Sequence, residues 1–191
     1  MLISLLYLFD GGLLPRIALA AFVHELGHAL AIWAMGARVL RLHLGLVGMR
    51  IDYEGGRVGY LGEVIIALSG PMANLALAYA ASRFGQGAEG EGWFLLSGIS
   101  LGAAIFNLLP IRQLDGGRAL YGLLAYVLGP ETAGWIESVL SGVLVVVLFG
   151  VGFAVFLWTG WNFTLLTVAI WLVISYCKSR GSAVQYAVRE Y

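Results

Sequence analysis

Two of the three histidines in this 191-residue chain stand four residues apart, in the segment His24-Glu25-Leu26-Gly27-His28. Residues four apart on an α-helix lie on one face, about one turn from each other, so both imidazoles can reach a single ion. This H-E-x-x-H spacing is typical of sites in which two neutral imidazoles bind zinc. Glu25 lies too far around the helix to be a third ligand and is placed to take a proton from a water on the metal. The motif therefore predicts metal-assisted hydrolysis.

The helix that carries this motif is apolar and long enough to cross a membrane. Arg16 to Met35 is about 20 residues, close to the length that a bilayer requires. The whole chain is 60% hydrophobic and 12% charged, against about 45–50% and about 25% in soluble domains. Ionisable groups at membrane depth are costly and usually functional, and the alternative is a polar cluster that joins helices. The formal net charge is zero, so no basic field indicates nucleic acid.

The other apolar segments predict an α-helical polytopic membrane protein with about five to six transmembrane segments. Besides the motif helix, spans are expected at Leu61–Ala81, Trp93–Leu109, Ile136–Trp158 and Trp161–Cys177. Met1–Phe9 and Ala119–Leu128 are too short to cross a bilayer alone. The chain is predicted to be one domain, residues 1–191, with a motif-bearing core at about 16–120 and additional helices at 133–177.

Between the first two spans, apolar and polar residues alternate. Leucines at 40, 42, 44 and 46 alternate with Arg41 and His43, and a second alternation runs from Met49 to Glu54. A period of two predicts a small membrane-associated β-hairpin or sheet after the motif helix. Its edge could receive an extended substrate. His43 falls within the alternation, so we expect it to be a surface strand residue rather than a metal ligand.

Basic residues predict which end of the motif helix faces the cytoplasm. Arg16 and Arg83 would lie on one side of the membrane. The other nine Arg and Lys residues would lie opposite: Arg38, Arg41, Arg50, Arg57, Arg112, Arg118, Lys178, Arg180 and Arg189. The side with the larger number is expected to be cytoplasmic. This orientation places His28 and Asp115 in the inner half of the membrane.

A zinc ion held by two histidines needs a third protein ligand and keeps one position for water. The chain has three aspartates, Asp10, Asp52 and Asp115. Asp10 is expected near the opposite membrane face and Asp52 in a strand region, so depth favours Asp115. The alternative for Asp115 is a turn aspartate before Gly116-Gly117, a common arrangement.

Three motifs together carry a resemblance to a known family. The H-E-x-x-H segment, Ser69-Gly70-Pro71-Met72-Ala73-Asn74, and the stretch from Asn107 to Gly117 with its Leu-Asp-Gly-Gly ending resemble the site-2 protease family of intramembrane zinc metalloproteases. The resemblance covers about Arg16 to Leu120. It implies one Zn²⁺ per chain, held by His24, His28 and Asp115, with Glu25 as the general base. It also implies that Asn107 and Asn74 lie beside the site and hold the substrate backbone.

The resemblance also implies a branch of the family. The loops between motifs leave no room for an inserted PDZ domain, and the tail after Cys177 is too short for a CBS domain. The compact core is similar to the sporulation-type branch, which cleaves a membrane-tethered pro-sigma factor. Gln113 stands where many members have proline.

The resulting expectation is regulated intramembrane proteolysis by a multi-pass protein of a bacterial-type cell membrane, with its active site toward the cytoplasm. The substrate would be a single-span or membrane-tethered protein cut within or next to its transmembrane segment, without a nucleic-acid partner. A regulatory membrane partner or a homo-oligomer stays open. A catalytically silent adaptor of the same fold is the first alternative. A transporter is the second, although the chain has no internal repeat of the kind that transporters often carry.

Overall fold

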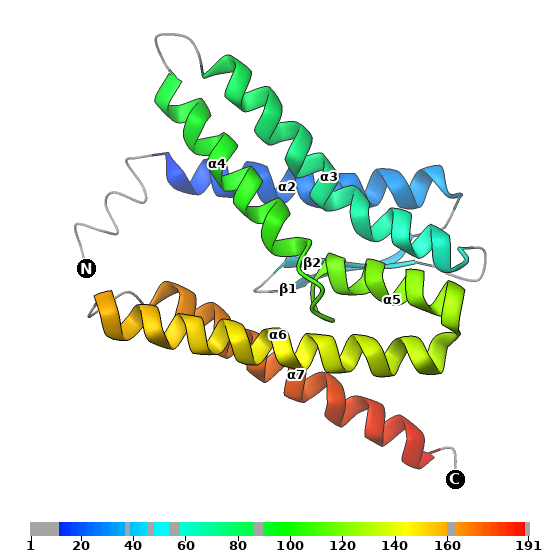
Figure 1. The fold of residues 1–191 in the computed structure, drawn as a ribbon. Helices are drawn as coiled ribbons and strands as arrows, with labels where there is room; N and C mark the ends of the chain where they lie inside the picture. The colour runs from blue at the N-terminus through cyan, green and yellow to red at the C-terminus, as the bar shows by residue number, and fades with distance from the viewer. Residues whose placement is uncertain are drawn as a thin grey trace. The chain divides into compact units, whose positions relative to one another are not determined.

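The computed structural model describes residues 12–36, 39–45, 48–53, 58–85, 90–159 and 163–189. Within these ranges, six helices and two strands follow in the order α2, β1, β2, α3, α4, α5, α6, α7 (Figure 1). The chain forms two compact units, Met1–Leu109 and Pro110–Tyr191. The boundary falls inside the predicted motif-bearing core at about 16–120. The short apolar segment Met1–Phe9, and Asp10 after it, lie outside the described residues.

The first unit contains α2 (Leu13–Ala34), α3 (Tyr60–Phe84) and α4 (Gly90–Asn107). Helices α2 and α3 pack closely because Gly27 has no side chain: a Cβ there would lie 2.6 Å from the Ser69 carbonyl oxygen. Small residues permit such close approach between membrane helices. Polar contacts hold α4 against these two helices. Ser97 Oγ donates to the Ala78 carbonyl of α3 at 2.8 Å, and Arg16 Nε of α2 donates to the Gly92 carbonyl of α4 at 2.8 Å.

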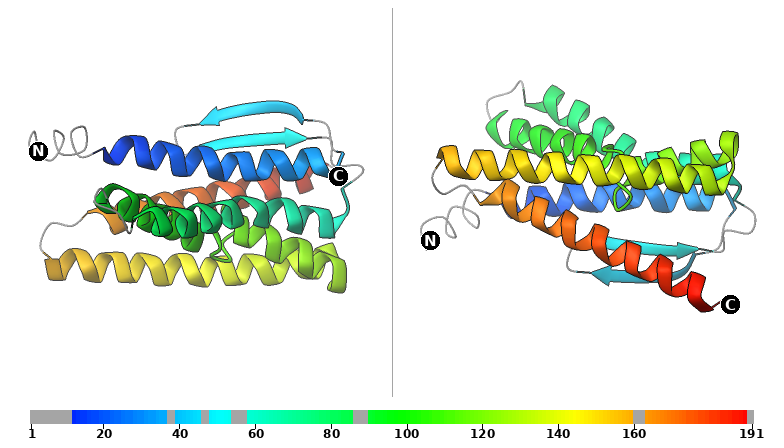
Figure 2. Two further views of the ribbon diagram at one scale, coloured as in Figure 1. Left: turned by 90° about the horizontal axis from the view of Figure 1, so that it is seen from above. Right: turned by 60° about the horizontal axis from the view of Figure 1, so that its bottom comes forward.

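A β-hairpin follows α2 in the stretch where the alternation predicts strands. Strand β1 (Val39–Gly45) pairs antiparallel with β2 (Gly48–Tyr53), and the hairpin runs alongside α2 (Figure 2). The register places Arg41 opposite Asp52 and His43 opposite Arg50. Helix α2 ends before it because Gly36 adopts a left-handed φ of 68°, which suits the residue after a helix end.

The second unit contains α5 (Asp115–Leu128), α6 (Pro130–Thr159) and α7 (Thr164–Arg189). The chain reverses between α5 and α6 at Gly129, whose φ of 85° few other residues adopt, and Pro130 then starts α6. Helix α7 packs on α6 where Gly142 leaves room for the Tyr176 ring. The Tyr176 hydroxyl donates to the Ser138 carbonyl at 3.0 Å.

Three helices in the described part of the chain are long and apolar enough to cross a membrane: α2, α3 and α6. This is fewer than the predicted five to six. Helix α4 has 18 residues, which cover about 27 Å at about 1.5 Å per residue, and glycine, serine and glutamate dilute its apolar content. In α7, the apolar stretch among the described residues is Leu165–Cys177.

Candidate metal centre

The two motif histidines lie on the buried face of α2. His24 is 9% exposed and His28 is 7% exposed. Their Nε2 atoms are 3.2 Å apart, and the ring planes are nearly perpendicular at 84°. Because four residues on a helix make slightly more than one turn, the two rings meet edge to face at one level. The i,i+4 spacing therefore produces the converging nitrogen pair that the sequence predicts.

The outer nitrogen of each ring faces α3. His28 Nδ1 lies 2.8 Å from the carbonyl oxygen of Ile66, which can only accept a hydrogen bond. This partner favours the tautomer with the proton on Nδ1, in which Nε2 of the neutral ring keeps the lone pair that a metal needs. His24 Nδ1 lies 3.3 Å from Nδ2 of Asn74. Metal-bound histidines usually have such a partner on the second nitrogen.

Gly70 makes space for both rings. A Cβ at this position would lie 2.7 Å from His28 Cε1 and 2.9 Å from His24 Cε1, and still closer to His28 Nε2. Carbon atoms do not approach that closely, so any larger residue would displace the imidazoles. The Ser69-Gly70-Pro71 stretch is thus the wall of α3 against which the two histidines stand.

The histidine pair fits a zinc ion. Two nitrogens at about 2.0–2.1 Å from a tetrahedral metal are about 3.3 Å apart, and the Nε2 atoms of His24 and His28 are 3.2 Å apart. Both rings are buried, and the Ile66 carbonyl favours the His28 tautomer that zinc requires. The donor set of the first unit is therefore of the kind and spacing that zinc uses.

Two other predicted site residues belong to the same unit. Glu25 follows His24, so it lies about 100° around α2 from that ring, and it is only partly buried. Asn107 is the last residue of α4, where its Nδ2 donates to the Ala103 carbonyl at 3.0 Å. The structure thus brings Asn74 to the histidine pair and ties the amide of Asn107 to its own helix.

Asp115, the predicted third ligand, is the first residue of α5 in the second unit and is buried. A carboxylate in the first helical turn is favoured by the helix dipole. Its Oδ1 lies 3.8 Å from Nη1 of Arg118, one turn along. Before the helix, the Leu114 N–H donates to the Ile111 carbonyl at 2.8 Å and closes a turn. A Cβ on Gly117 would overlap the Ile111 carbonyl, which explains a glycine there.

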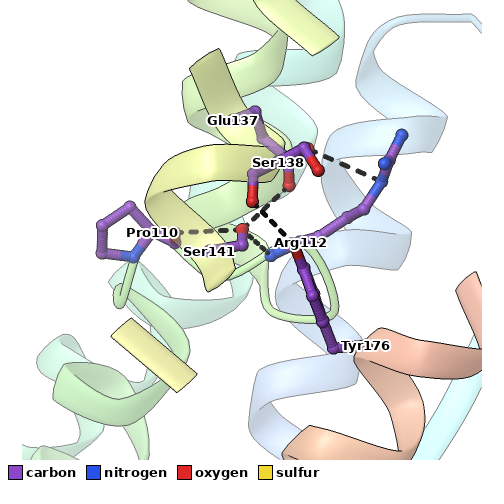
Figure 3. Close-up of polar contacts among 6 residues, drawn as sticks. All are labelled: Pro110, Arg112, Glu137, Ser138, Ser141 and Tyr176. Atoms are coloured by element: carbon purple, nitrogen blue, oxygen red, sulfur yellow. Dashed lines mark hydrogen bonds and ion pairs between the residues drawn. The ribbon is translucent and has the colours of Figure 1, made fainter. Parts of the chain in front are cut away.

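Side chains of α6 hold the segment that leads to Asp115 (Figure 3). The Arg112 N–H donates to Ser141 Oγ at 2.9 Å, and Ser141 Oγ donates to Oε1 of Glu137 at 3.1 Å. The Arg112 guanidinium lies 3.6 Å from the other carboxylate oxygen of Glu137. Glu137 is 1% exposed. Sequence reasoning missed this anchor, although a glutamate within the predicted span Ile136–Trp158 was a visible signal.

Each unit thus contributes buried residues of types that bind metal ions, His24 and His28 in the first unit and Asp115 in the second. The helices and these side chains define a class, namely a multi-pass membrane protein with buried candidate metal ligands. Among the described residues, large apolar side chains such as Trp33 (78% exposed) and Val146 (70% exposed) face outward, as expected of surfaces in contact with lipid.

Two relatives in comparisons with known proteins are named as zinc metalloproteases. A Synechocystis protein named "Putative zinc metalloprotease sll0528" is 32% identical over 130 residues, which are 64% of this chain and 34% of that protein. A Xylella fastidiosa protein named "Putative zinc metalloprotease" is 45% identical over 56 residues, 28% of this chain and 12% of that protein. The chain therefore matches about a third or less of the length of these relatives. No protein-family model matches it.

The fold has a solved counterpart. The site-2 protease from Methanocaldococcus jannaschii superimposes with a TM-score of 0.66, covering 93% of this chain and 86% of that one at 19% identity. The chain therefore has a site-2 protease fold, as the three sequence motifs predict.

Proposed function

We propose that this protein is an intramembrane zinc metalloprotease that hydrolyses a peptide bond within or next to a transmembrane segment of a membrane-anchored substrate. The observation that carries the proposal is the buried pair of Nε2 atoms, 3.2 Å apart, on a helix apolar and long enough to cross a bilayer. The site-2 protease fold and the names of the relatives support it.

Asp115 is the proposed third ligand of one Zn²⁺ per chain. It is buried although it is a carboxylate, and it begins a helix directly after the Leu114 turn. Two histidines and a carboxylate form a catalytic donor set that leaves one position for water. A turn aspartate alone does not require burial, so its burial favours ligation over a purely structural role.

Glu25 is the proposed general base and acid. When bound at this site, zinc lowers the pKa of a water molecule toward neutrality and polarises the scissile carbonyl. A carboxylate oxygen of Glu25 takes a proton from the attacking water and then gives it to the nitrogen of the leaving amine. Glu25 is partly exposed beside the buried pair, so it can reach water that His24 and His28 do not contact directly.

The substrate must present an extended backbone, because peptide groups in a transmembrane helix are already hydrogen-bonded within the helix. Strand β2 packs on α2, and in the described part of the chain no strand pairs with the outer edge of β1. We propose that the substrate adds to this edge, with Asn107 contacting its backbone. Leu42→Pro should reduce cleavage because it removes a backbone donor from β1, while Leu42→Val should not.

The cytoplasmic half of the membrane is the proposed location of the site, because nine of the eleven Arg and Lys residues would lie on that side. The strand-forming segment directly after the motif helix supports assignment to the sporulation-type branch. The substrate would then be a membrane-tethered protein, not a soluble peptide.

The test is cleavage of a panel of single-span substrates co-expressed with the wild type or with Glu25→Gln, together with zinc analysis of both purified proteins. Glu131→Gln, an exposed glutamate in the first turn of α6, is the matched control. We expect near-stoichiometric zinc in all three proteins, and cleavage by the wild type and Glu131→Gln only. Zinc in none of them would exclude the metalloprotease and leave a transporter or adaptor. Zinc with tight binding but no cleavage of any substrate would favour the silent adaptor.

A further inference from the structure

The carboxamide of Asn74 is buried beside His24 and has no role in the proposed chemistry described above. Asn74 is 1% exposed, and its Nδ2 lies 3.3 Å from His24 Nδ1. Its Oδ1 is also buried and has no hydrogen-bond partner among the described residues. A buried carbonyl oxygen without a partner costs about 1–3 kcal/mol and requires an explanation.

The proton on His24 decides which atom of the Asn74 carboxamide faces the ring. If zinc binds as proposed, His24 Nε2 must carry a lone pair, so the proton of the neutral ring is on Nδ1. Nδ1–H then faces the Asn74 NH₂ group, and two donors point at each other. Rotating the carboxamide by 180° exchanges its nitrogen and oxygen, which are assigned from hydrogen bonding. Oδ1 then accepts from Nδ1–H at the same 3.3 Å position, and the NH₂ group takes the buried position that Oδ1 leaves.

We infer that Asn74 is a positioning residue whose carboxamide oxygen accepts the Nδ1 proton of His24 and keeps Nε2 available for the metal. This inference rests on the proposed zinc site and gives Asn74 a role other than the substrate contact predicted from sequence. His28 has the equivalent partner in the Ile66 carbonyl at 2.8 Å. Helix α3 therefore supplies one oxygen acceptor to each ring, a backbone carbonyl for His28 and a side-chain oxygen for His24.

Replacing Asn74 by aspartate distinguishes a hydrogen-bond acceptor to His24 from a donor. Asn74→Asp keeps the shape and offers only acceptor oxygens, so it should keep the His24 tautomer. Asn74→Ala and Asn74→Leu remove the acceptor, and loss of such a partner typically weakens metal binding by about 10- to 100-fold. Ser100→Ala is the matched control, because Ser100 is fully buried in α4 and its hydroxyl has no hydrogen-bond partner among the described residues.

The experiment measures zinc affinity of the full-length proteins in detergent by competition with a chromogenic chelator. We expect Asn74→Asp and Ser100→Ala to stay within about threefold of the wild type and Asn74→Ala and Asn74→Leu to bind about 10- to 100-fold more weakly. Equal loss in the aspartate and alanine variants, or no loss in the alanine variant, would overturn the inference. A wild type that binds no zinc would instead overturn the proposed function.

A second measurement needs no variant and therefore does not depend on folding of Asn74→Asp. The chain has three histidines, so ¹⁵N-histidine NMR of the zinc-loaded wild type can report the protonated nitrogen of each ring. We expect Nδ1–H for both His24 and His28. An Nε2–H form of His24 in the loaded protein would contradict the role of Asn74.

Discussion

The proposed metal ligands of the two units are held in different ways. In the first unit, His24 and His28 follow each other on one helix, and Gly70 of α3 gives them room. In the second unit, the segment before Asp115 is irregular and is held by Ser141 and Glu137 of α6. The histidine pair is set by helix geometry and close packing, whereas the aspartate segment is set by a few polar side chains.

This difference predicts how each region tolerates change. A close-packed wall has no slack, so one added methyl group displaces the rings it touches. A hydrogen-bonded anchor has several contacts, so loss of one weakens the segment without removing it. Substitutions beside the histidines should therefore abolish the site, while substitutions in α6 should loosen it.

The largest effect is expected for Gly70→Ala. Its Cβ would lie within 3 Å of carbon atoms of both His24 and His28, so the rings must move apart. We expect zinc affinity to fall by at least about 100-fold, the upper end for loss of a ligand partner, and stability to fall by about 1–3 kcal/mol. Gly98→Ala is the control, since its Cβ meets no described heavy atom within 4 Å. Normal zinc binding by Gly70→Ala would show that α3 can shift away from the two histidine rings and contradict this prediction.

Gly117→Ala probes the turn before α5. Its Cβ would overlap the Ile111 carbonyl, which is backbone and has no rotamer to change. We expect a loss of about 1–3 kcal/mol in thermal unfolding and weaker zinc binding, because Asp115 starts the same helical turn. Gly134→Ala in α6 is the matched control, with Tyr121 Cε2 no closer than 4.0 Å. An unchanged unfolding temperature for Gly117→Ala would mean that the turn opens at little cost.

Ser141→Ala tests the anchor itself. It removes the acceptor of the Arg112 N–H and the donor to Glu137. We expect a loss of about 1 kcal/mol, as for polar contacts between membrane helices, and a smaller effect on zinc affinity than that of Gly70→Ala. In a double-mutant cycle with Glu137→Ala, the two losses should not add, because both act on one network. Additive losses of stability would show that Ser141 and Glu137 act independently.

The same contrast explains what the sequence predicts and what it does not. The histidine pair is local, four residues apart on one helix, and the hairpin follows from a period of two, so both can be predicted from spacing. The partner of His24 lies 50 residues away at Asn74, and the anchor of Arg112 lies 29 residues away at Ser141. Such contacts depend on how helices pack, which periodicity does not specify.

The transmembrane segments mark a further limit of sequence reasoning. Apolar blocks predict five to six crossings, while three described helices are long and apolar enough. A hydrophobic block in the sequence indicates burial, but it does not distinguish burial in lipid from burial in protein. Helix α4 illustrates this, because part of its surface packs on α2 and α3. Length and hydropathy therefore identify three crossings among the described helices and do not decide whether α4 and α7 cross as well.

Tyr176→Phe should have the smallest effect on stability. It tests whether the packing of α7 on α6 influences zinc binding. The substitution removes only the hydroxyl that donates to the Ser138 carbonyl at 3.0 Å. Hydrogen bonds between membrane helices contribute about 0.6 kcal/mol on average, so we expect a loss of that size in unfolding and unchanged zinc affinity. Tyr79→Phe, on an exposed ring of α3, is the control. A loss of zinc with Tyr176→Phe would contradict this expectation, since Ser138 lies one residue from Glu137 and would then transmit the change to the anchor.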